Sequence, residues 1–189
     1  RLMEGVVDKR RKEFTAGRLC AREALSLLGI REFPLLIGEN RVPLWPDHLT
    51  GCISHTADCC GVVVAPANQV SAMGLDIEST ERVKEKLWSM IFSPSEIAWL
   101  QSLPLNERPR YASLIFSAKE CFYKCQYMLT RQWLGFMDAS IHSNLESRTF
   151  EVTLLSHINE SFPAGSRMSG GYVFHKDLVY TGMCFIYNS

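Results

Sequence analysis

The chain has 189 residues, enough for one large domain or two small ones with a hydrophobic core. Hydrophobic residues make up 47% of it and charged residues 21%, a composition that excludes a disordered chain. Twenty Lys and Arg balance twenty Asp and Glu, so no general attraction to nucleic acid or acidic lipid is expected. No apolar run approaches the roughly 20 residues of a membrane-spanning helix.

The first half of the chain predicts a helix followed by three short strands. Apolar residues recur at helical spacing over residues 13–28, and Gly29 is a typical helix end. A proline-rich stretch follows, which argues against a long regular element there. Short β-rich runs separated by turn residues then predict an antiparallel meander of strands at 52–55, 61–65 and 71–77.

The second half of the chain repeats this plan. Ser93-Pro94-Ser95-Glu96 predicts a helix start, with Ser at the N-cap, Pro in the first turn and Glu three residues later. That helix should end near residue 103, and a longer one should span 110–129. Strands are predicted at 149–156, 171–175 and 178–187.

These elements predict an α+β fold of two similar halves. Each half would contain helices and a small antiparallel meander of three strands, so that the second half repeats the first. The boundary between the halves is placed at residue 84, which gives domains at 1–84 and 85–189.

The cysteines indicate the redox environment. There are seven, an odd number, and no signal-peptide pattern opens the chain, so reduced thiols in a cytoplasmic protein are expected. A zinc site formed by Cys52, His55, Cys59 and Cys60 is disfavoured, because the paired Cys-x-x-Cys spacing is missing. The chain begins with Arg instead of Met, so we expect residues to be missing upstream.

Two carboxylates end the last predicted strand of the first half. Asp76 and Glu78 are two residues apart, so their side chains point to the same face of the strand. Taken alone, they are best interpreted as solvated acids. Because an apolar strand precedes them, they are also well placed to hold Mg²⁺, which prefers carboxylates together with water and substrate phosphates.

Glu120 and Lys124 share a face of the long predicted helix because they are four residues apart. An ordinary surface ion pair is the alternative, and the two residues alone leave both interpretations open. Phe116 lies one turn earlier on the same stripe, and Lys119 is adjacent. Such a mixture of aromatic, acidic and basic residues indicates a cleft.

Four further residues have the chemistry to bind phosphate. His55 follows Ser54 at a strand end, although a lone His is more often structural than catalytic. Arg18 and Arg22 are four residues apart on the first predicted helix, and for Arg22 a solvated position is preferred. The Gly-x-x-x-x-Gly-Lys, Gly-x-Gly-x-x-Gly and Gly-x-Ser-x-Gly motifs are absent, which argues against NTPase, Rossmann and α/β-hydrolase folds.

Taken together, these elements resemble the signature of the 4′-phosphopantetheinyl transferases. The resemblance rests on Gly74-Leu75-Asp76-Ile77-Glu78 and on Phe116-Ser117-Ala118-Lys119-Glu120-Cys121-Phe122-Tyr123-Lys124. Upstream, Ile53-Ser54-His55-Thr56 is similar to the family's Ile-Ser-His element, and residues 14–22 are similar to its N-terminal helix. The length and the two-half layout resemble the Sfp-type branch, and Phe116 together with the Phe-x-Ala-Gly-Arg-like helix resembles its EntD-like bacterial subgroup.

The resemblance implies Mg²⁺-dependent transfer of the 4′-phosphopantetheine group from coenzyme A to a serine of an apo acyl or peptidyl carrier protein, which releases 3′,5′-ADP. It implies that Asp76, Glu78 and Glu120 are the metal ligands. It further implies that the catalytic residues are Glu120, as acceptor of the serine proton, Lys124, at the pyrophosphate, and Asp76. The residues implied to bind coenzyme A are Arg18, Arg22, Arg41, Ser54, His55, Lys119 and Lys124.

Three other interpretations stay open at this point. The chain could be a catalytically silent binder of coenzyme A or carrier protein, although its three intact carboxylates argue against this. It could be another Mg²⁺-dependent phosphotransferase. It could bind nucleic acid through Lys9-Arg10-Arg11-Lys12, a weak footprint on a neutral chain. The family resemblance instead implies a cytoplasmic monomer with internal pseudo-symmetry, no nucleic-acid partner and no membrane span, serving carrier proteins of fatty-acid, nonribosomal-peptide or siderophore biosynthesis.

Overall fold

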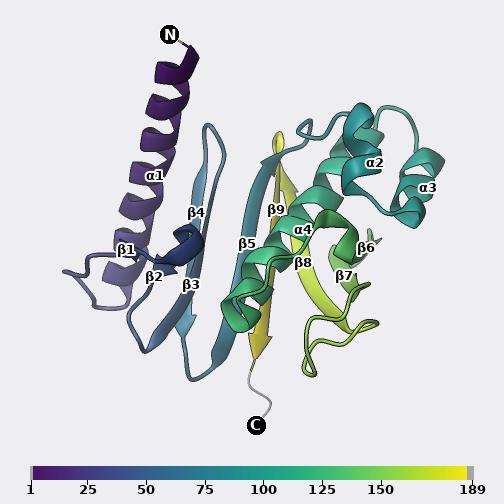
Figure 1. Ribbon diagram of the computed structural model, residues 1–189. Helices are drawn as coiled ribbons and strands as arrows, with labels where there is room; N and C mark the ends of the chain where they lie inside the picture. The colour runs from purple at the N-terminus through teal and green to yellow at the C-terminus, as the bar shows by residue number, and fades with distance from the viewer. Residues whose placement is uncertain (1, 187–189) are drawn as a thin grey trace.

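The computed structural model describes residues 2–186, and for residues 2–10 the backbone only (Figure 1). The architecture is α+β, as predicted. The helices are α1 (Leu2–Leu27), α2 (Trp88–Ile91), α3 (Pro94–Ser102) and α4 (Arg108–Thr130). The strands are β1 (Leu36–Ile37), β2 (Pro43–Leu44), β3 (Leu49–His55), β4 (Cys60–Pro66), β5 (Val70–Ser79), β6 (Ala139–Asn144), β7 (Thr149–Leu154), β8 (Arg167–His175) and β9 (Leu178–Ile186).

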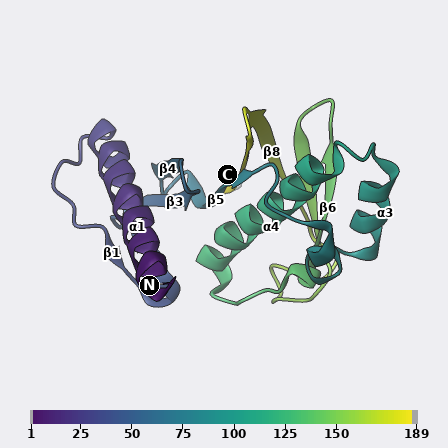
Figure 2. The ribbon, with the colours of Figure 1, turned by 90° about the horizontal axis from the view of Figure 1, so that it is seen from above.

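The N-terminal part of the molecule contains α1 and two small sheets, which lie together on one side in Figure 2. Ala21 and Leu25 of α1 are buried, and the helix packs on β4. The chain leaves the helix at Gly29, whose φ of +83° is a conformation that glycine adopts without strain. The predicted helix is confirmed, and it begins earlier than its apolar pattern indicated.

The strands of the first half pair differently from the prediction. β3 and β4 form an antiparallel hairpin, in which His55 lies opposite Cys60. β5 does not complete a three-stranded meander with them, because it pairs with β9 from the second half of the chain. The three strands are confirmed, but their arrangement as one meander is wrong.

Side chains fill the place of a backbone ladder between β3 and β5. The Leu75 N–H donates to Cys52 Sγ at 3.3 Å, and the Ile77 N–H donates to Ser54 Oγ at 3.1 Å. Because these β3 side chains satisfy the β5 donors, the two backbones need not pair with each other. We call this contact the seam, and Asp76 of β5 lies within it.

The C-terminal part contains a five-stranded antiparallel sheet in the order β5-β9-β8-β7-β6. The three strands predicted in the second half are confirmed as β7, β8 and β9, and residue 187 lies outside the described residues. The prediction of a three-stranded sheet is wrong, because β5 and β6 extend it at its edges. β6 was not recognised because His142-Ser143-Asn144 obscure the alternation in which Ala139 and Ile141 are buried.

Helix α4 packs across one face of this sheet and forms much of the hydrophobic core (Figures 1 and 2). Its close approach to β5 requires glycine at position 74, since a Cβ there would lie 2.0 Å from the Cys121 carbonyl oxygen. The predicted capping box at the start of α3 is confirmed, because Ser93 and Glu96 each accept the other's backbone N–H. Gly74 therefore lets α4 bring its side chains onto Asp76, two residues further along β5.

Candidate active site

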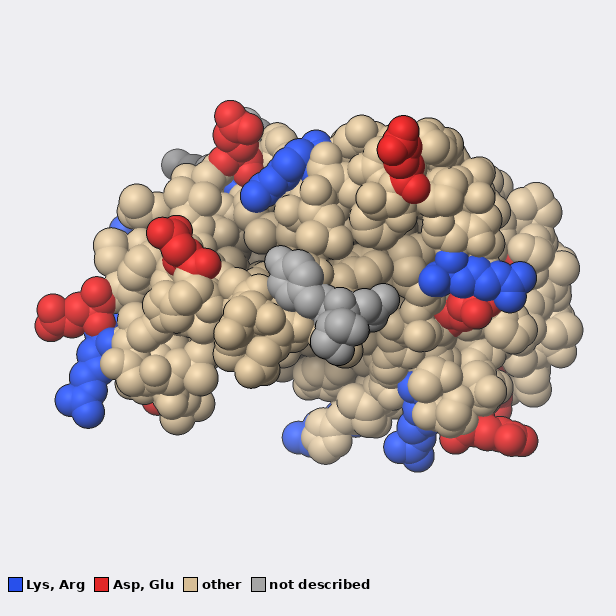
Figure 3. Space-filling model, turned by 90° about the horizontal axis from the view of Figure 1, so that it is seen from below, with Lys and Arg blue, Asp and Glu red and all other residues tan. Residues whose placement is uncertain are grey.

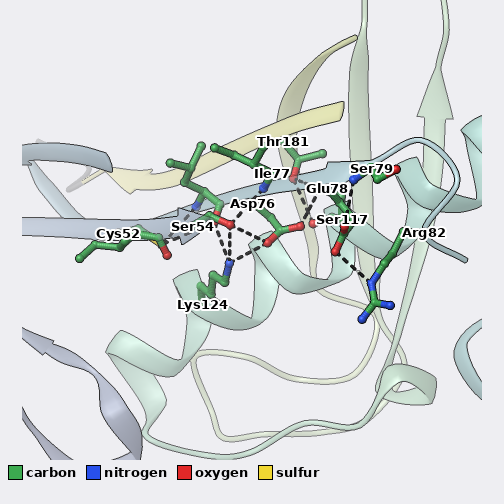
Figure 4. Close-up of polar contacts among 12 residues, drawn as sticks. Cys52, Ser54, Asp76, Ile77, Glu78, Ser79, Arg82, Ser117, Lys124 and Thr181 are labelled. Atoms are coloured by element: carbon green, nitrogen blue, oxygen red, sulfur yellow. Dashed lines mark hydrogen bonds and ion pairs between the residues drawn. The ribbon is translucent and has the colours of Figure 1, made fainter. Parts of the chain in front are cut away.

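Asp76 is the centre of a buried polar network where β3, β5 and α4 meet (Figure 4). Its Oδ1 accepts hydrogen bonds from Ser54 Oγ at 3.0 Å and from Lys124 Nζ at 2.7 Å. Its Oδ2 accepts one from Ser117 Oγ at 2.8 Å, and Thr181, opposite Asp76 on β9, donates to the Ser117 carbonyl. Three donors therefore hold this carboxylate in one orientation.

Lys124 carries the positive charge of this network. Its Nζ also donates to Ser54 Oγ and to the Leu75 carbonyl, each at 3.1 Å. Burial alone would lower the pKa of Lys124, but the Asp76 carboxylate outweighs it, and the pKa lies above its ordinary value. The side chain is still 30% exposed, so the ammonium remains accessible from outside the network.

Glu120 lies one helical turn before Lys124 and lines the same cavity. Among the residues that the structure describes, none forms a hydrogen bond or ion pair with its carboxylate. Burial raises the pKa of Glu120, and the Asp76 charge raises it further, whereas Lys124 lowers it. A carboxylate with raised proton affinity and unengaged oxygens has the properties of a general base.

Glu78 has partners of its own. Its Oε1 accepts the Ser79 N–H at 2.9 Å, and its Oε2 lies 3.3 Å from Arg82 Nε (Figure 4). Burial raises the pKa of Glu78 and the Asp76 charge adds to the rise, while the Ser79 N–H and Arg82 oppose it. Negative charge therefore converges at Asp76, Glu78 and Glu120.

The donor chemistry of this acidic group fits Mg²⁺, which prefers oxygen ligands. Within residues 11–186, whose side chains the structure describes, no three Asp, Glu, His or Cys side chains are close enough to form a ready metal site. Lys124 pairs with Asp76 and Arg82 pairs with Glu78. The three predicted ligands thus share one region, and two of them are neutralised there by cationic side chains.

Two neighbouring cavities lie at the site, and Glu120 of the acidic group lines the first of them. The central cavity, of about 300 Å³, contains Glu120 and Lys124 and is walled by aromatic and apolar side chains. The basic cavity, of about 560 Å³, shares Arg41, Pro43 and Ile53 with the central one. The shared residues place the two cavities side by side, so one elongated ligand could occupy both.

The basic cavity brings together predicted phosphate ligands from distant parts of the chain. Arg18, Arg41 and His55 line it, together with Arg11. The Arg18 guanidinium lies 4.7 Å from the centre of the Phe14 ring, and its Nη2 donates to the Leu36 carbonyl at 3.4 Å. Its buried Nε has no hydrogen-bond partner among the described residues, which leaves a donor for a ligand.

Lys119 corrects one predicted ligand of coenzyme A. Its side chain is fully buried, and Nζ donates to Glu96 Oε2, the Ile91 carbonyl and the Phe136 carbonyl at 2.7–2.9 Å. These bonds use all three N–H groups of an ammonium. The prediction was wrong because Lys119, although adjacent to Glu120 in sequence, lies on the core side of α4.

Ser54 also differs from its predicted role, while the contribution of Arg22 to binding stays a prediction. The Ser54 hydroxyl donates to Asp76 and accepts from Ile77 N–H and Lys124 Nζ, so its hydrogen-bonding capacity is used within the seam. Arg22 is exposed and lines a neighbouring cavity of about 310 Å³, which shares Phe14 and Arg18 with the basic cavity. Ser54 therefore orients the network, and Arg22 lies beside the basic cavity without lining it.

Two residues at the site were missed in the sequence. Ser117 lies seven residues before Lys124, two helical turns away, and this spacing places both on the face of α4 that contacts Asp76. Arg82 follows Glu78 by four residues and pairs with it. The spacing was visible for both, but the face of each element that meets the acids depends on tertiary packing.

On the face shown in Figure 3, Lys, Arg, Asp and Glu are scattered and do not form a patch of one charge. Of the basic run considered for nucleic-acid binding, Lys9 and Arg10 have side chains outside the described residues. None of the helices described between residues 2 and 186 has the length and apolar character needed to cross a membrane.

Fold and site together define an α+β protein with an acidic group beside a basic cavity, an arrangement suited to a diphosphate ligand. Family models match both parts of the chain. Residues 1–65 match the 4′-phosphopantetheinyl transferase N-terminal domain, and residues 72–173 match the 4′-phosphopantetheinyl transferase superfamily. The chain belongs to this superfamily, which confirms the resemblance carried by its motifs.

Curated relatives agree with this assignment. The chain is 35% identical to the 4′-phosphopantetheinyl transferase PptT of Mycobacterium tuberculosis, over 94% of this chain and 80% of PptT. It is 37% identical to Svp of Streptomyces mobaraensis, over 79% of this chain but only 61% of Svp. It is 40% identical to enterobactin synthase component D of Salmonella typhi, over 61% of this chain and 48% of that protein.

Solved structures of two synthases overlap with part of the chain. The holo-[acyl-carrier-protein] synthase of Thermotoga maritima gives a TM-score of 0.41 at 16% identity, covering 64% of this chain and 65% of that one. The holo-ACP-synthase of Plasmodium yoelii gives 0.43 at 15% identity, covering 64% of this chain and 97% of that one.

Proposed function

We propose that this protein transfers the 4′-phosphopantetheine group of coenzyme A to a serine of an apo acyl or peptidyl carrier protein, with Mg²⁺, and releases 3′,5′-ADP. One observation carries the proposal: Glu120, an unengaged carboxylate, lies beside the Asp76–Lys124 pair in a cavity that adjoins a basic cavity. Proton acceptor, cationic group and phosphate-binding surface are thus adjacent, as phosphoryl transfer requires.

The basic cavity would bind the nucleotide end of coenzyme A. Arg18, Arg41 and His55 supply N–H donors there, and Arg18 has a buried Nε without a partner. A guanidinium recognises phosphate through paired hydrogen bonds. Because Arg41 lines both cavities, a pyrophosphate bound near it would point from the basic cavity toward Glu120 and Lys124.

The acidic group would hold the metal through Asp76, Glu78 and Glu120. When bound, Mg²⁺ supplies charge neutralisation at the pyrophosphate oxygens. Ser54 and Ser117 fix the orientation of the Asp76 carboxylate. The Lys124 ammonium remains protonated, since its pKa is raised, and offers a second positive charge to the leaving diphosphate.

Glu120 would accept the proton of the carrier serine while the serine oxygen forms a bond to the pantetheine-bearing phosphorus. The bond from that phosphorus to the bridging oxygen breaks, and 3′,5′-ADP leaves with the oxygen. The raised pKa of Glu120 strengthens it as a base, and Lys124 stabilises the negative charge that develops on the leaving group. Each charge of the reaction thus has a matching side chain.

The deciding experiment incubates an apo carrier protein with coenzyme A, Mg²⁺ and this protein, and follows the intact mass of the carrier. We expect a gain of one phosphopantetheine group at the serine, dependent on Mg²⁺. Binding of coenzyme A without a mass gain would identify a silent binder, and transfer to another diphosphate substrate alone would identify a different phosphotransferase. Parallel fatty-acid and siderophore-type carriers test substrate class, and gel filtration tests the proposed monomer.

Localisation is a proposal of the same kind. All seven cysteines are free thiols within the described residues, and burial raises the pKa of Cys52, Cys121 and Cys125. Protonated buried thiols suit a reducing compartment such as the cytoplasm. Fractionation of cells that produce the protein would test this, and recovery in an oxidising compartment would contradict it.

A further inference from the structure

Lys119 and Glu96 form an ion pair inside the hydrophobic core, away from both cavities. Lys119 Nζ and Glu96 Oε2 are 2.9 Å apart, and the two side chains are 0% and 1% exposed. Isolated charges are costly to bury, so a pair in this position needs complete hydrogen bonding. Both members have it, and their other partners show what the pair connects.

The pair joins four segments that surround the middle of α4. Glu96 accepts the N–H of Ser93 at 2.6 Å and that of Ile141 on β6 at 2.7 Å. Lys119 donates to the carbonyls of Ile91 at the end of α2 and of Phe136, in the 3₁₀ turn Phe136–Asp138. An unbranched apolar side chain of similar length, such as Met in place of Lys119, could fill the same space but could not make these hydrogen bonds.

The turn at Phe136 carries this restraint to Glu120. The Phe136 ring packs against Phe116 with centroids 5.5 Å apart and against Tyr123 at 5.7 Å. On α4, Phe116 lies one turn before Glu120 and Tyr123 lies about one turn after it. The Tyr123 hydroxyl also donates to the Gly135 carbonyl, immediately before the turn. The segment bonded to Lys119 therefore packs against α4 residues on both sides of Glu120, one turn away in each direction.

We propose that Lys119 and Glu96 are positioning residues for Glu120: the pair fixes the Phe136 turn, and the turn fixes the part of α4 that presents the Glu120 carboxylate to the cavity. This rests on the proposed role of Glu120 as the proton acceptor. Misplacement of a catalytic group by about 1 Å can cost about 100-fold in rate, so a small shift is enough. Lys119 thus acts on the reaction from the core, without contact with coenzyme A.

The test uses the double variant Glu96→Gln with Lys119→Met, which removes both charges and keeps side-chain size. Because the double variant leaves no unpaired buried charge, its unfolding midpoint should fall less than that of Glu96→Ala, although the Ile91 and Phe136 carbonyls lose their donor. We expect kcat to fall about 10- to 100-fold, with the KM for coenzyme A within about twofold of the parent. Amide exchange should become faster in residues 116–124 and 133–138.

Leu114→Ala is the matched control, because Leu114 is fully buried on α4 and takes no part in the hydrogen bonds of the pair. We expect it to lower the unfolding midpoint through a core cavity and to keep the parent's kcat at temperatures where it is folded. A kcat loss that merely follows stability in both variants would overturn the proposal. So would a folded double variant with the parent's kcat and exchange rates.

Phe136→Leu provides a second variant that keeps the ion pair intact. It removes the ring contacts with Phe116 and Tyr123, and we expect a several-fold loss of kcat with an unchanged KM for coenzyme A. An unchanged kcat would refute the route through the turn, even if the double variant does not fold. If the parent itself transfers nothing, the proposed function fails, and the exchange rates at 116–124 still decide whether the pair orders this segment.

Discussion

Helix α4 carries two lysine–carboxylate pairs that are alike in chemistry and different in surroundings. Lys119 pairs with Glu96 at 2.9 Å and Lys124 pairs with Asp76 at 2.7 Å. The first pair is sealed in the core, whereas the Lys124 side chain is 30% exposed at the edge of the central cavity. Five residues along one helix therefore separate a structural pair from a pair that a ligand can reach.

The surroundings act in opposite directions on the two lysines. Burial lowers the pKa of Lys119, and the Glu96 carboxylate offsets this only in part. At Lys124 the effect of burial is outweighed by Asp76, and the pKa is raised. The core pair has every hydrogen bond it can use, while the cavity pair has a third carboxylate, Glu120, nearby without a partner. Saturated bonding fixes a structure, and incomplete bonding leaves capacity for a substrate.

The largest effect is expected when the unengaged carboxylate is altered. Glu120→Gln keeps the shape of the side chain but cannot accept the serine proton, so the rate should fall about 10²- to 10⁴-fold. The dissociation constant for coenzyme A should change little, because the basic cavity is untouched. Single-turnover transfer and calorimetry of coenzyme A measure the two quantities. A variant within tenfold of the parent at saturating substrate would make Glu120 a bystander.

Breaking the two pairs in turn tests their difference in stability. Glu96→Ala strands a fully buried ammonium and should cost about 3–5 kcal/mol. Asp76→Ala should cost less, about 1–3 kcal/mol, because Lys124 can turn toward solvent while Ser54 and Ser117 lose a partner. Repulsion among the acids alone would make Asp76→Ala harmless in EDTA, but its three hydrogen bonds reverse that expectation.

Urea denaturation in EDTA measures both losses, and Asp58→Asn, in an exposed turn, controls for the loss of an acid. Equal losses at the two sites would remove the distinction between the core pair and the cavity pair. Asp76→Ala should also be inactive in transfer, and full turnover by this variant would contradict its assignment to the acidic group.

The sequence allowed much of this site to be predicted, and the limits have physical causes. Spacing on a strand and on a helix predicted that Asp76 and Glu78, and Glu120 and Lys124, share faces. Spacing could not show which side of α4 enters the core, so Lys119 was assigned to the cofactor. Whether a charged residue is buried depends on what packs against it, which no periodicity of its own element reports.

The prediction of strand pairing from the sequence was limited for the same reason. The alternation in β5 predicted a strand, but its partner β9 lies about as far away as the chain allows. At the seam, the N–H groups of β5 bond to the side chains of Cys52 and Ser54 instead of to the β3 backbone. Which of these acceptors they bond to depends on tertiary packing and cannot be predicted from the sequence pattern. The proposed boundary at residue 84 stays a prediction, since β5 belongs to the first half in sequence and to the C-terminal sheet in pairing.

A smaller effect is expected at the basic cavity, where Arg18 can be compared with Arg22 one turn further along α1. If the guanidinium holds the 3′-phosphate, Arg18→Ala should weaken the binding of coenzyme A by about 1.5–3 kcal/mol. The binding of dephospho-coenzyme A, which lacks this phosphate, should hardly change. Arg22→Ala should change neither affinity, because Arg22 lies outside the basic cavity. Calorimetric titration of both ligands into each protein gives the coupling.

Equal losses for the two ligands would move Arg18 to the pyrophosphate. No loss for either would remove it from the binding site and leave its contacts with Phe14 and Leu36 as its whole role. Arg18→Lys should rescue poorly, since an ammonium cannot reproduce the planar pair of donors.

The smallest expected effect concerns the pH dependence of stability in the absence of metal. The folded protein raises the pKa of Glu120, mainly by burial and then by the Asp76 charge. A carboxyl whose folded pKa exceeds its unfolded value keeps its proton in the folded state where the unfolded chain has lost it. Ionised Glu120 therefore costs stability, and this cost appears as pH rises from the unfolded pKa through the folded pKa.

Glu120→Gln should consequently be more stable than the parent at neutral pH in EDTA. The difference should shrink as pH falls and vanish below about 4, where Glu is protonated in both states. Urea midpoints from pH 4 to 8 measure it, and Glu146→Gln, an exposed acid in the turn before β7, subtracts the general effect of losing a charge. A parent that is the more stable protein at pH 7 would mean that Glu120 has a favourable partner, and the contrast with the satisfied core pair would fail.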